Sequence, residues 1–208
     1  MPKEIRLAIW IIVFILVVLA FLSWILYPLF RKKMMRKNPI ESYYRHIMRL
    51  AKYGDYYLIN GLKIRSDDPA SPKIDHILIG NKYFYLIYDY YFEGAVDANM
   101  SDDYWLYHKD DGKKERLFNP MRLAADASDQ FSLVYSLNPS FLITIVLIND
   151  DCFISQFKND EAHYLLTPLS KLDRLVDSFE KQDIAAFDAN ELEKIVQKLH
   201  ARKEQEDA

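Results

Sequence analysis

The sequence predicts a mixed α+β domain that follows an N-terminal transmembrane helix. Residues 7–30 contain no charged residue, short β-type runs separated by turns fill the middle of the chain, and segments with helical spacing surround them. We expect a short N-terminal tail over residues 1–6, the transmembrane helix over 7–30 and a basic linker over 31–39. One domain then covers residues 40–200, and residues 201–208 form a charged tail.

The expected transmembrane helix consists almost entirely of Leu, Ile, Val, Ala, Phe and Trp. At about 1.5 Å per residue, residues 7–30 are long enough to cross a hydrocarbon core of about 30 Å. The run is also longer than the roughly 7–15 apolar residues of a cleaved signal peptide. More bases follow it than precede it, and the positive-inside rule then places the C-terminal side in the cytoplasm. We therefore expect a single-pass protein of the cell membrane with a cytoplasmic domain and the lipid bilayer as a partner.

The formal charge of −3 conceals an uneven distribution. Residues 1–37 hold seven of the 27 Lys and Arg but one of the 30 Asp and Glu, so the remainder carries −9. Duplex-binding surfaces are usually basic, so nucleic acid is possible but not favoured, and an unidentified protein is the expected further partner. The single cysteine, Cys152, excludes an internal disulfide and, next to Phe153, suits a buried structural thiol.

The first half of the domain reads as one helix and three strands. Apolar spacing predicts a helix over residues 40–52. A strand over 56–64 follows, interrupted by the turn-like pair Asn60-Gly61. Strands over 74–79 and 83–92, separated by a short glycine-containing turn, are typical of a hairpin.

The second half begins with a less regular strand pair around Trp105 and Leu117. Asn119-Pro120 then supplies an N-cap and a first-turn proline for a helix. The β-branched run over 141–148 is typical of a central buried strand, and a short strand over 153–157 follows.

Two further helices are expected near the C-terminus. Thr167-Pro168 opens one, and the capping pair Asp188 and Glu191 opens the last. The charged tail after it is expected to fray.

These elements carry a resemblance to a known family. The segment Ile74-Asp75-His76-Ile77-Leu78-Ile79-Gly80 resembles the signature strand of the nuclease-related domain, NERD, a branch of the PD-(D/E)XK nucleases. Gly94, Trp105 and Asn119-Pro120 follow at intervals similar to those of the family. The resemblance implies a restriction-endonuclease-like α-β-β-β-α-β sandwich.

The residues that carry the family's chemistry are mostly absent. The resemblance implies a metal-binding Asp, followed on the next strand by a Glu and a Lys two residues apart, on the same face. Asp75 matches the Asp, but Tyr88 and Tyr90 occupy the Glu and Lys positions, and Leu123 stands where a Gln is frequent. One carboxylate and two tyrosines form a poor Mg²⁺ site, because hard cations require several oxygen ligands.

Asp75 is therefore either a vestigial ligand or a structural residue that caps a loop or pairs with a neighbour. We expect a catalytically inactive NERD-like protein, without a cofactor, that binds or scaffolds at the cytoplasmic membrane face. One alternative is an active nuclease in which Asp75 with Asp89 or Glu93 holds Mg²⁺, although Asp89 points to the opposite face in a regular strand. Another is a membrane-tethered adaptor of unrelated fold.

Two other patterns have structural and functional interpretations. The histidines show no metal-ligand spacing, so zinc is not expected. The aromatic side chains between Tyr83 and Phe92 could stack on bases, but aromatic residues also favour strands and fill cores, and Lys82 is the only base beside them. We expect these aromatic side chains to belong to the core.

Overall fold

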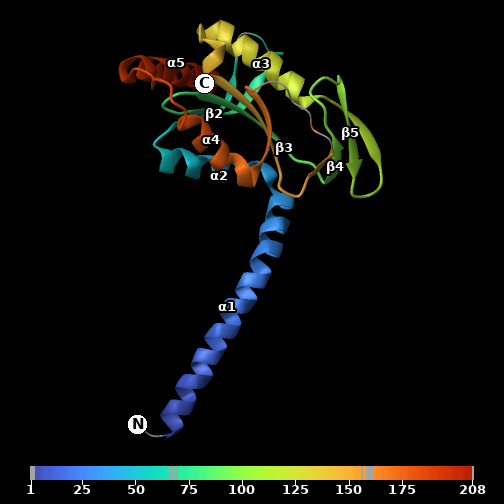
Figure 1. The fold of residues 1–208 in the computed structure, drawn as a ribbon, viewed down its shortest axis with the longest axis vertical. Helices are drawn as coiled ribbons and strands as arrows, with labels where there is room; N and C mark the ends of the chain where they lie inside the picture. The colour runs from blue at the N-terminus through green and yellow to red at the C-terminus, as the bar shows by residue number, and fades with distance from the viewer. Residues whose placement is uncertain (1–2, 66–67, 69, 156, 158–161, 208) are drawn as a thin grey trace. The chain divides into compact units, whose positions relative to one another are not determined.

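The computed structural model describes residues 3–65, 68, 70–155, 157 and 162–207. The chain divides into two compact units, Met1–Ser42 and Tyr43–Ala208, and Figure 1 shows its elements in order. The first unit consists of helix α1 (Lys3–Lys37) and the beginning of α2 (Pro39–Gly54). The stretch expected as a linker is therefore helical as far as Lys37.

The expected transmembrane helix over residues 7–30 requires correction. Within the residues that the structure describes, no helix is both long and apolar enough to cross a membrane.

The second unit is the mixed α+β domain that the patterns predict. Its larger sheet has five strands in the order β1-β2-β3-β7-β9. The first three are antiparallel neighbours, whereas β7 and β9 run parallel to β3. The strands are β1 (Tyr57–Lys63), β2 (Lys73–Ile79), β3 (Phe84–Tyr90), β7 (Leu142–Ile148) and β9 (Tyr164–Pro168).

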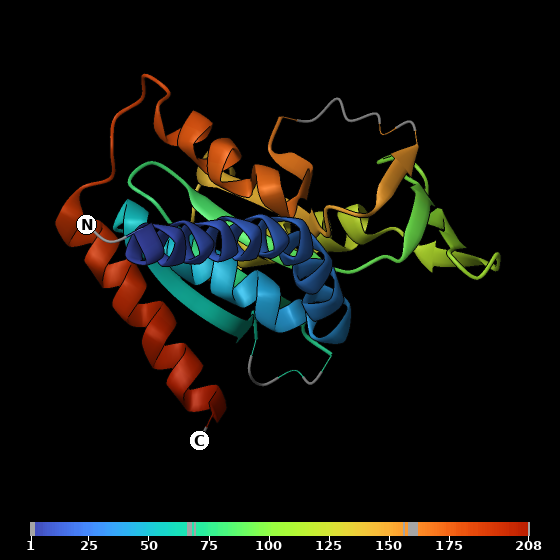
Figure 2. The same ribbon diagram turned by 90° about the horizontal axis from the view of Figure 1, so that it is seen from below.

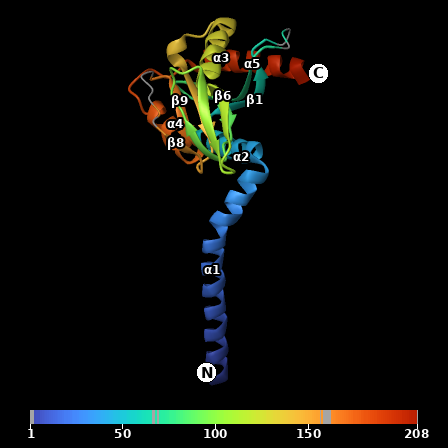
Figure 3. The ribbon, with the colours of Figure 1, turned by 90° about the vertical axis from the view of Figure 1, so that its right-hand side faces the viewer.

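The simple α-β-β-β-α-β order is also corrected, because a second sheet lies beside the first. It has four strands in the order β6-β5-β4-β8, and Figure 3 shows it from the side on which its hairpin faces the viewer. The strands are β4 (Gly94–Asp97), β5 (Tyr104–Lys109), β6 (Lys114–Phe118) and β8 (Phe153–Ser155).

Helices cover both faces of the larger sheet. In Figure 1, α3 (Pro120–Tyr135) and α5 (Ala189–Asp207) lie on one side, and α2 and α4 (Leu172–Glu180) on the other. The core on the α3 side includes alternate residues of β3, such as Leu86 and Tyr88. The intervening residues of β3, such as Tyr85 and Ile87, are buried as well. Every residue of β7 is buried, as a central strand requires.

Several boundaries differ from the sequence prediction for identifiable reasons. Asn60-Gly61 does not break β1, because Gly61 adopts a φ of 66° within the strand. Thr167-Pro168 ends β9 instead of opening a helix, and the next helical turn begins at Leu169. The tail is helical as far as Asp207, and Glu206 accepts a hydrogen bond from the backbone N–H of Lys63 at 3.1 Å. Figure 2 shows α5 beside β1.

Asn119 connects the start of α3 to the preceding loop. Its carboxamide oxygen accepts from the N–H of Met121 at 2.9 Å, which is the expected N-cap. Its amide donates to the carbonyls of Asn99, Met100 and Asp102 at 3.1, 3.1 and 2.6 Å. The side chain is completely buried, so no solvent replaces these partners.

Asn119→Ala is expected to lower the free energy of unfolding by about 3 kcal/mol, because it removes a helix cap together with the hydrogen bonds of a buried amide to three loop carbonyls. Asn138→Ala is the matched control, since Asn138 also caps a short helix, through Ser140 at 3.0 Å, but is exposed. The control should cost no more than about 1 kcal/mol. Equal losses in urea unfolding of the two variants would contradict the role of the buried amide.

Candidate functional site

Asp75 and Tyr88 lie side by side on neighbouring strands. His76 of β2 pairs with Ile87 of β3 in antiparallel register, so the residue before His76 lies beside the residue after Ile87. Side chains alternate along a strand, so Asp75, Tyr88 and Tyr90 share one face. This is the face on which the family resemblance places the Asp, Glu and Lys of a nuclease site.

The Asp75 carboxylate already has a structural partner. Its Oδ2 accepts from the backbone N–H of Asp89 at 2.9 Å. The backbone pairing of β2 with β3 ends at His76 and Ile87, so the Asp75 side chain continues the contact between the two strands beyond their last residue pair. The contact matches the structural interpretation of Asp75.

Tyr88 and Tyr90 cannot replace the missing Glu and Lys as charged groups. Burial first, and the Asp75 carboxylate second, raise the pKa of both phenols above the usual value. Both hydroxyls are therefore neutral at pH 7, and the Tyr88 hydroxyl is buried without a hydrogen-bond partner among the described residues. One engaged carboxylate and two neutral phenols do not fit a Mg²⁺ ion.

A buried polar network occupies the opposite face of the same strands. The Asp89 carboxylate contacts His76 Nε2 at 2.8 Å, and His76 Nδ1 contacts the carboxamide oxygen of Asn60 at 2.6 Å. The His76 and Asp89 side chains are only 5% and 7% exposed. Burial raises the pKa of Asp89, although His76 opposes this shift. The second Asp89 oxygen, Oδ1, is buried and lacks a partner among the described residues.

The carboxylates of the alternative metal site point to other partners. Asp89 points toward His76, as strand alternation predicts. Glu93 is exposed beyond the end of β3, where its carboxylate accepts from the Tyr91 hydroxyl at 3.4 Å. Among the described residues, no three His, Cys, Asp or Glu side chains form a group that could hold a metal ion.

Two further residues that carry the family resemblance, Gly94 and Trp105, have roles in local structure. Gly94 has a φ of 123°, and a Cβ there would lie 2.2 Å from the carbonyl oxygen of His108. The Trp105 indole is buried and donates to the Asn99 carbonyl at 2.9 Å, which also accepts from Asn119. Leu123 is exposed on α3.

The aromatic run is mostly core. Five of its side chains are buried and therefore unavailable for stacking on bases, namely Tyr83, Phe84, Tyr85, Tyr88 and Phe92. Three other histidines have separate surroundings. His46 pairs with Asp173 at 2.7 Å, His108 pairs with Asp97 at 2.9 Å, and His200 is exposed.

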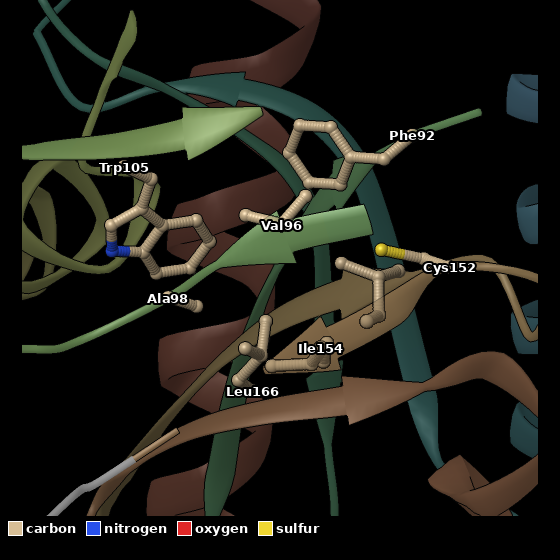
Figure 4. A pocket seen from close by; sticks show the side chains of 8 residues that line it. Phe92, Val96, Ala98, Trp105, Cys152, Ile154 and Leu166 are labelled. Atoms are coloured by element: carbon tan, nitrogen blue, oxygen red, sulfur yellow. The ribbon is translucent and has the colours of Figure 1, made fainter. Parts of the chain in front are cut away.

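A small apolar pocket lies between elements of the two sheets (Figure 4). Its lining residues are Phe92, Val96, Ala98, Trp105, Ile148, Cys152, Ile154 and Leu166. Burial raises the pKa of the Cys152 thiol to about 11, so the thiolate is scarce at pH 7. With aliphatic and aromatic walls and an inert thiol, the pocket suits core packing better than polar ligand recognition.

Comparison with known proteins gives no further assignment. No protein-family model matches the chain, and neither the curated proteins nor the solved structures include a match.

Sequence reasoning missed the His76–Asp89 pair, although one signal was present. The hairpin and its alternation place residues 76 and 89 on the same face of neighbouring strands. The partner on β1, Asn60, was assigned to a turn, and this assignment concealed the third member of the network.

The Asp89→Asn variant should reveal the raised pKa of Asp89. A carboxyl whose folded pKa exceeds its unfolded value contributes stability below the unfolded pKa, and this contribution is lost as pH rises through the folded pKa. The stability of Asp89→Asn relative to the unmodified chain should therefore increase from pH 4 to pH 8, as measured by urea unfolding.

Asp97→Asn is the matched control for this pH series. Hydrogen bonds from Ser155 and His108 lower the pKa of Asp97, so its contribution is present above the unfolded pKa and lost as pH falls. The relative stability of this variant should decrease as pH rises from 3 to 5. The same trend for Asp89→Asn would show that His76, rather than burial, dominates the pKa of Asp89.

Proposed function

We propose that this chain is a catalytically inactive NERD-like protein with a binding or scaffolding role at a membrane surface. The observation that carries the proposal is the shared face of Asp75, Tyr88 and Tyr90 on β2 and β3. The family resemblance requires a Glu and a Lys at the two tyrosine positions. The scaffold of the site is thus retained while its charged groups are replaced.

The contacts of Asp75 support the loss of catalysis. A metal-binding Asp must direct its carboxylate toward the ion, but Asp75 Oδ2 holds the backbone N–H of Asp89. Tyr88 is buried and its neutral hydroxyl offers no negative charge. Neither a second metal-binding carboxylate nor a cation that could orient water lies at these two positions.

The membrane part of the proposal rests on the surface of α1. Its described large apolar side chains are exposed, among them Trp10, Leu16 and Trp24 at 69, 60 and 74%. Apolar surface of this extent is typical of lipid contact. The basic sequence 31–37 favours the anionic cytoplasmic leaflet. The acidic remainder of the chain favours a protein over a nucleic acid as the further partner.

Two alternatives lead to different observations. A rebuilt Mg²⁺ site needs Asp89 or Glu93 to join Asp75, and the contact of Asp89 with His76 disfavours this arrangement. An adaptor of unrelated fold has no reason to place Asp75 on a strand beside Tyr88, where the structure has it.

Metal titration tests the loss of catalysis. Isothermal titration of Mg²⁺ and Mn²⁺ into the full-length chain should give no heat that depends on Asp75, with Asp75→Ala as the control. Incubation with plasmid DNA and either metal should leave the DNA intact. Metal-dependent cleavage that Asp75→Ala abolishes would overturn the proposal and favour the rebuilt nuclease.

Co-flotation with phosphatidylcholine vesicles tests the membrane role. The full-length chain should float with the vesicles, and a Leu16→Lys, Leu19→Lys variant should bind at least about tenfold less, because burial of each Leu contributes roughly 1.5–3 kcal/mol. Leu133→Lys is the matched control, since Leu133 is 78% exposed on α3. Equal flotation of all three proteins would remove α1 as the lipid contact.

A further inference from the structure

Within the second unit, helix α2 exposes a row of basic side chains beside an apolar pair. Tyr44 and Met48, one turn apart, are 38 and 46% exposed. Arg45, Arg49 and Lys52 are exposed next to them, at intervals of four and three residues. Residues at these intervals lie on one side of a helix.

The opposite side of α2 is fixed against the larger sheet. Tyr43, Ile47 and Ala51 are buried, and the Tyr43 hydroxyl donates to the carbonyl of Tyr90 at 2.9 Å. His46, at the border of the two sides, pairs with Asp173 of α4 at 2.7 Å. The exposed side therefore cannot rotate into the core, and its orientation is a property of the folded domain.

The charge of this surface is opposite to that of the domain around it. Residues 43–54 include Arg45, Arg49 and Lys52 and no Asp or Glu, whereas residues 38–208 carry a formal charge of −9. Tyr53 and Tyr57, 83 and 44% exposed, follow at the end of the helix and the start of β1. Exposed tyrosines beside bases are typical of segments at the membrane–water interface.

We infer that the exposed side of α2 docks on anionic lipid head groups. Arg49 and Lys52 would contact the lipid phosphates, while Tyr44 and Met48 reach the boundary of the acyl chains. This inference rests on the proposed membrane role and extends it, because it gives the folded domain its own lipid contact and orientation. The basic sequence 31–37 ends only two residues before α2 begins. The basic residues of this sequence and those of α2 are therefore close together along the chain.

Charge complementarity favours lipid over a second copy of the chain. Two copies meeting through this side of α2 would bring their Arg and Lys side chains together, which like-charge repulsion opposes. An acidic protein would also complement the bases, and the experiment includes this ligand as a separate arm.

The test uses the full-length chain with Cys152→Ser and an environment-sensitive fluorophore at Met48→Cys. Vesicles contain phosphatidylcholine alone or 30% phosphatidylglycerol, each with a head-group nitroxide lipid as quencher. Quenching of the label should be several-fold greater on the anionic vesicles. A label at Leu133→Cys, on exposed α3, should respond equally to both vesicles.

Neutralisation of two bases supplies the matched variant. Arg49→Gln with Lys52→Gln should reduce the ratio of docked to undocked domain by about 25-fold, since each base near an anionic surface contributes about 1 kcal/mol. The label itself stays at residue 48, and an unchanged melting temperature shows that the variant is folded. Salt at 0.5 M should reduce quenching in the same direction.

The outcomes separate this inference from the proposed function. Flotation with equal quenching of the residue 48 label on both vesicles would overturn the inference and leave the membrane role intact. Failure to float would overturn both. A larger response of the label to polyglutamate than to anionic vesicles would overturn lipid as the occupant and indicate an acidic protein.

Discussion

The antiparallel pairing of β2 with β3 determines what both faces of the larger sheet can do. Because side chains alternate, one register places Asp75 beside Tyr88 and, on the other face, His76 near Asp89. A register shift of one residue in one of the two strands would turn its side chains to the other face, and its polar side chains would then point into the apolar core beside α3. The helices therefore pack against two faces whose polarity this register determines.

The two faces show different ways of accommodating polar groups in a core. On the α3 side, the sheet buries the Tyr88 ring, at the expense of a hydroxyl that has no hydrogen-bond partner among the described residues. On the α2 side, Asp89 remains ionisable, and His76 and Asn60 compensate part of its burial. The face that carries Tyr88 is thus mostly apolar, while the buried polar network lies on the other face of the sheet.

Local patterns predicted most of the larger sheet and α3. The apolar run of β7 and the cap at Asn119 depend on neighbouring residues in sequence, so they could be identified directly. Strands β4 and β9, and the pairing of β4 with β8 in a second sheet, could not be identified, because these short strands gain stability only from partners distant in sequence. The same limitation applies to the site: the positions of Asp75, Tyr88 and Tyr90 followed from alternation, but the contact of Asp75 with the Asp89 backbone required the three-dimensional register.

The contact between Asp75 and the Asp89 backbone also limits how this face of the sheet could acquire a metal site. A Glu at residue 88 and a Lys at residue 90 would complete the motif of the family that the sequence resembles, but Asp75 would still accept a hydrogen bond from the backbone N–H of Asp89. To bind an ion, the carboxylate would have to release that N–H, and another acceptor would have to replace it. A metal site at this face would therefore need coordinated changes in the strand pairing as well as in the two tyrosines, and each single substitution alone would destabilise the sheet without creating the site.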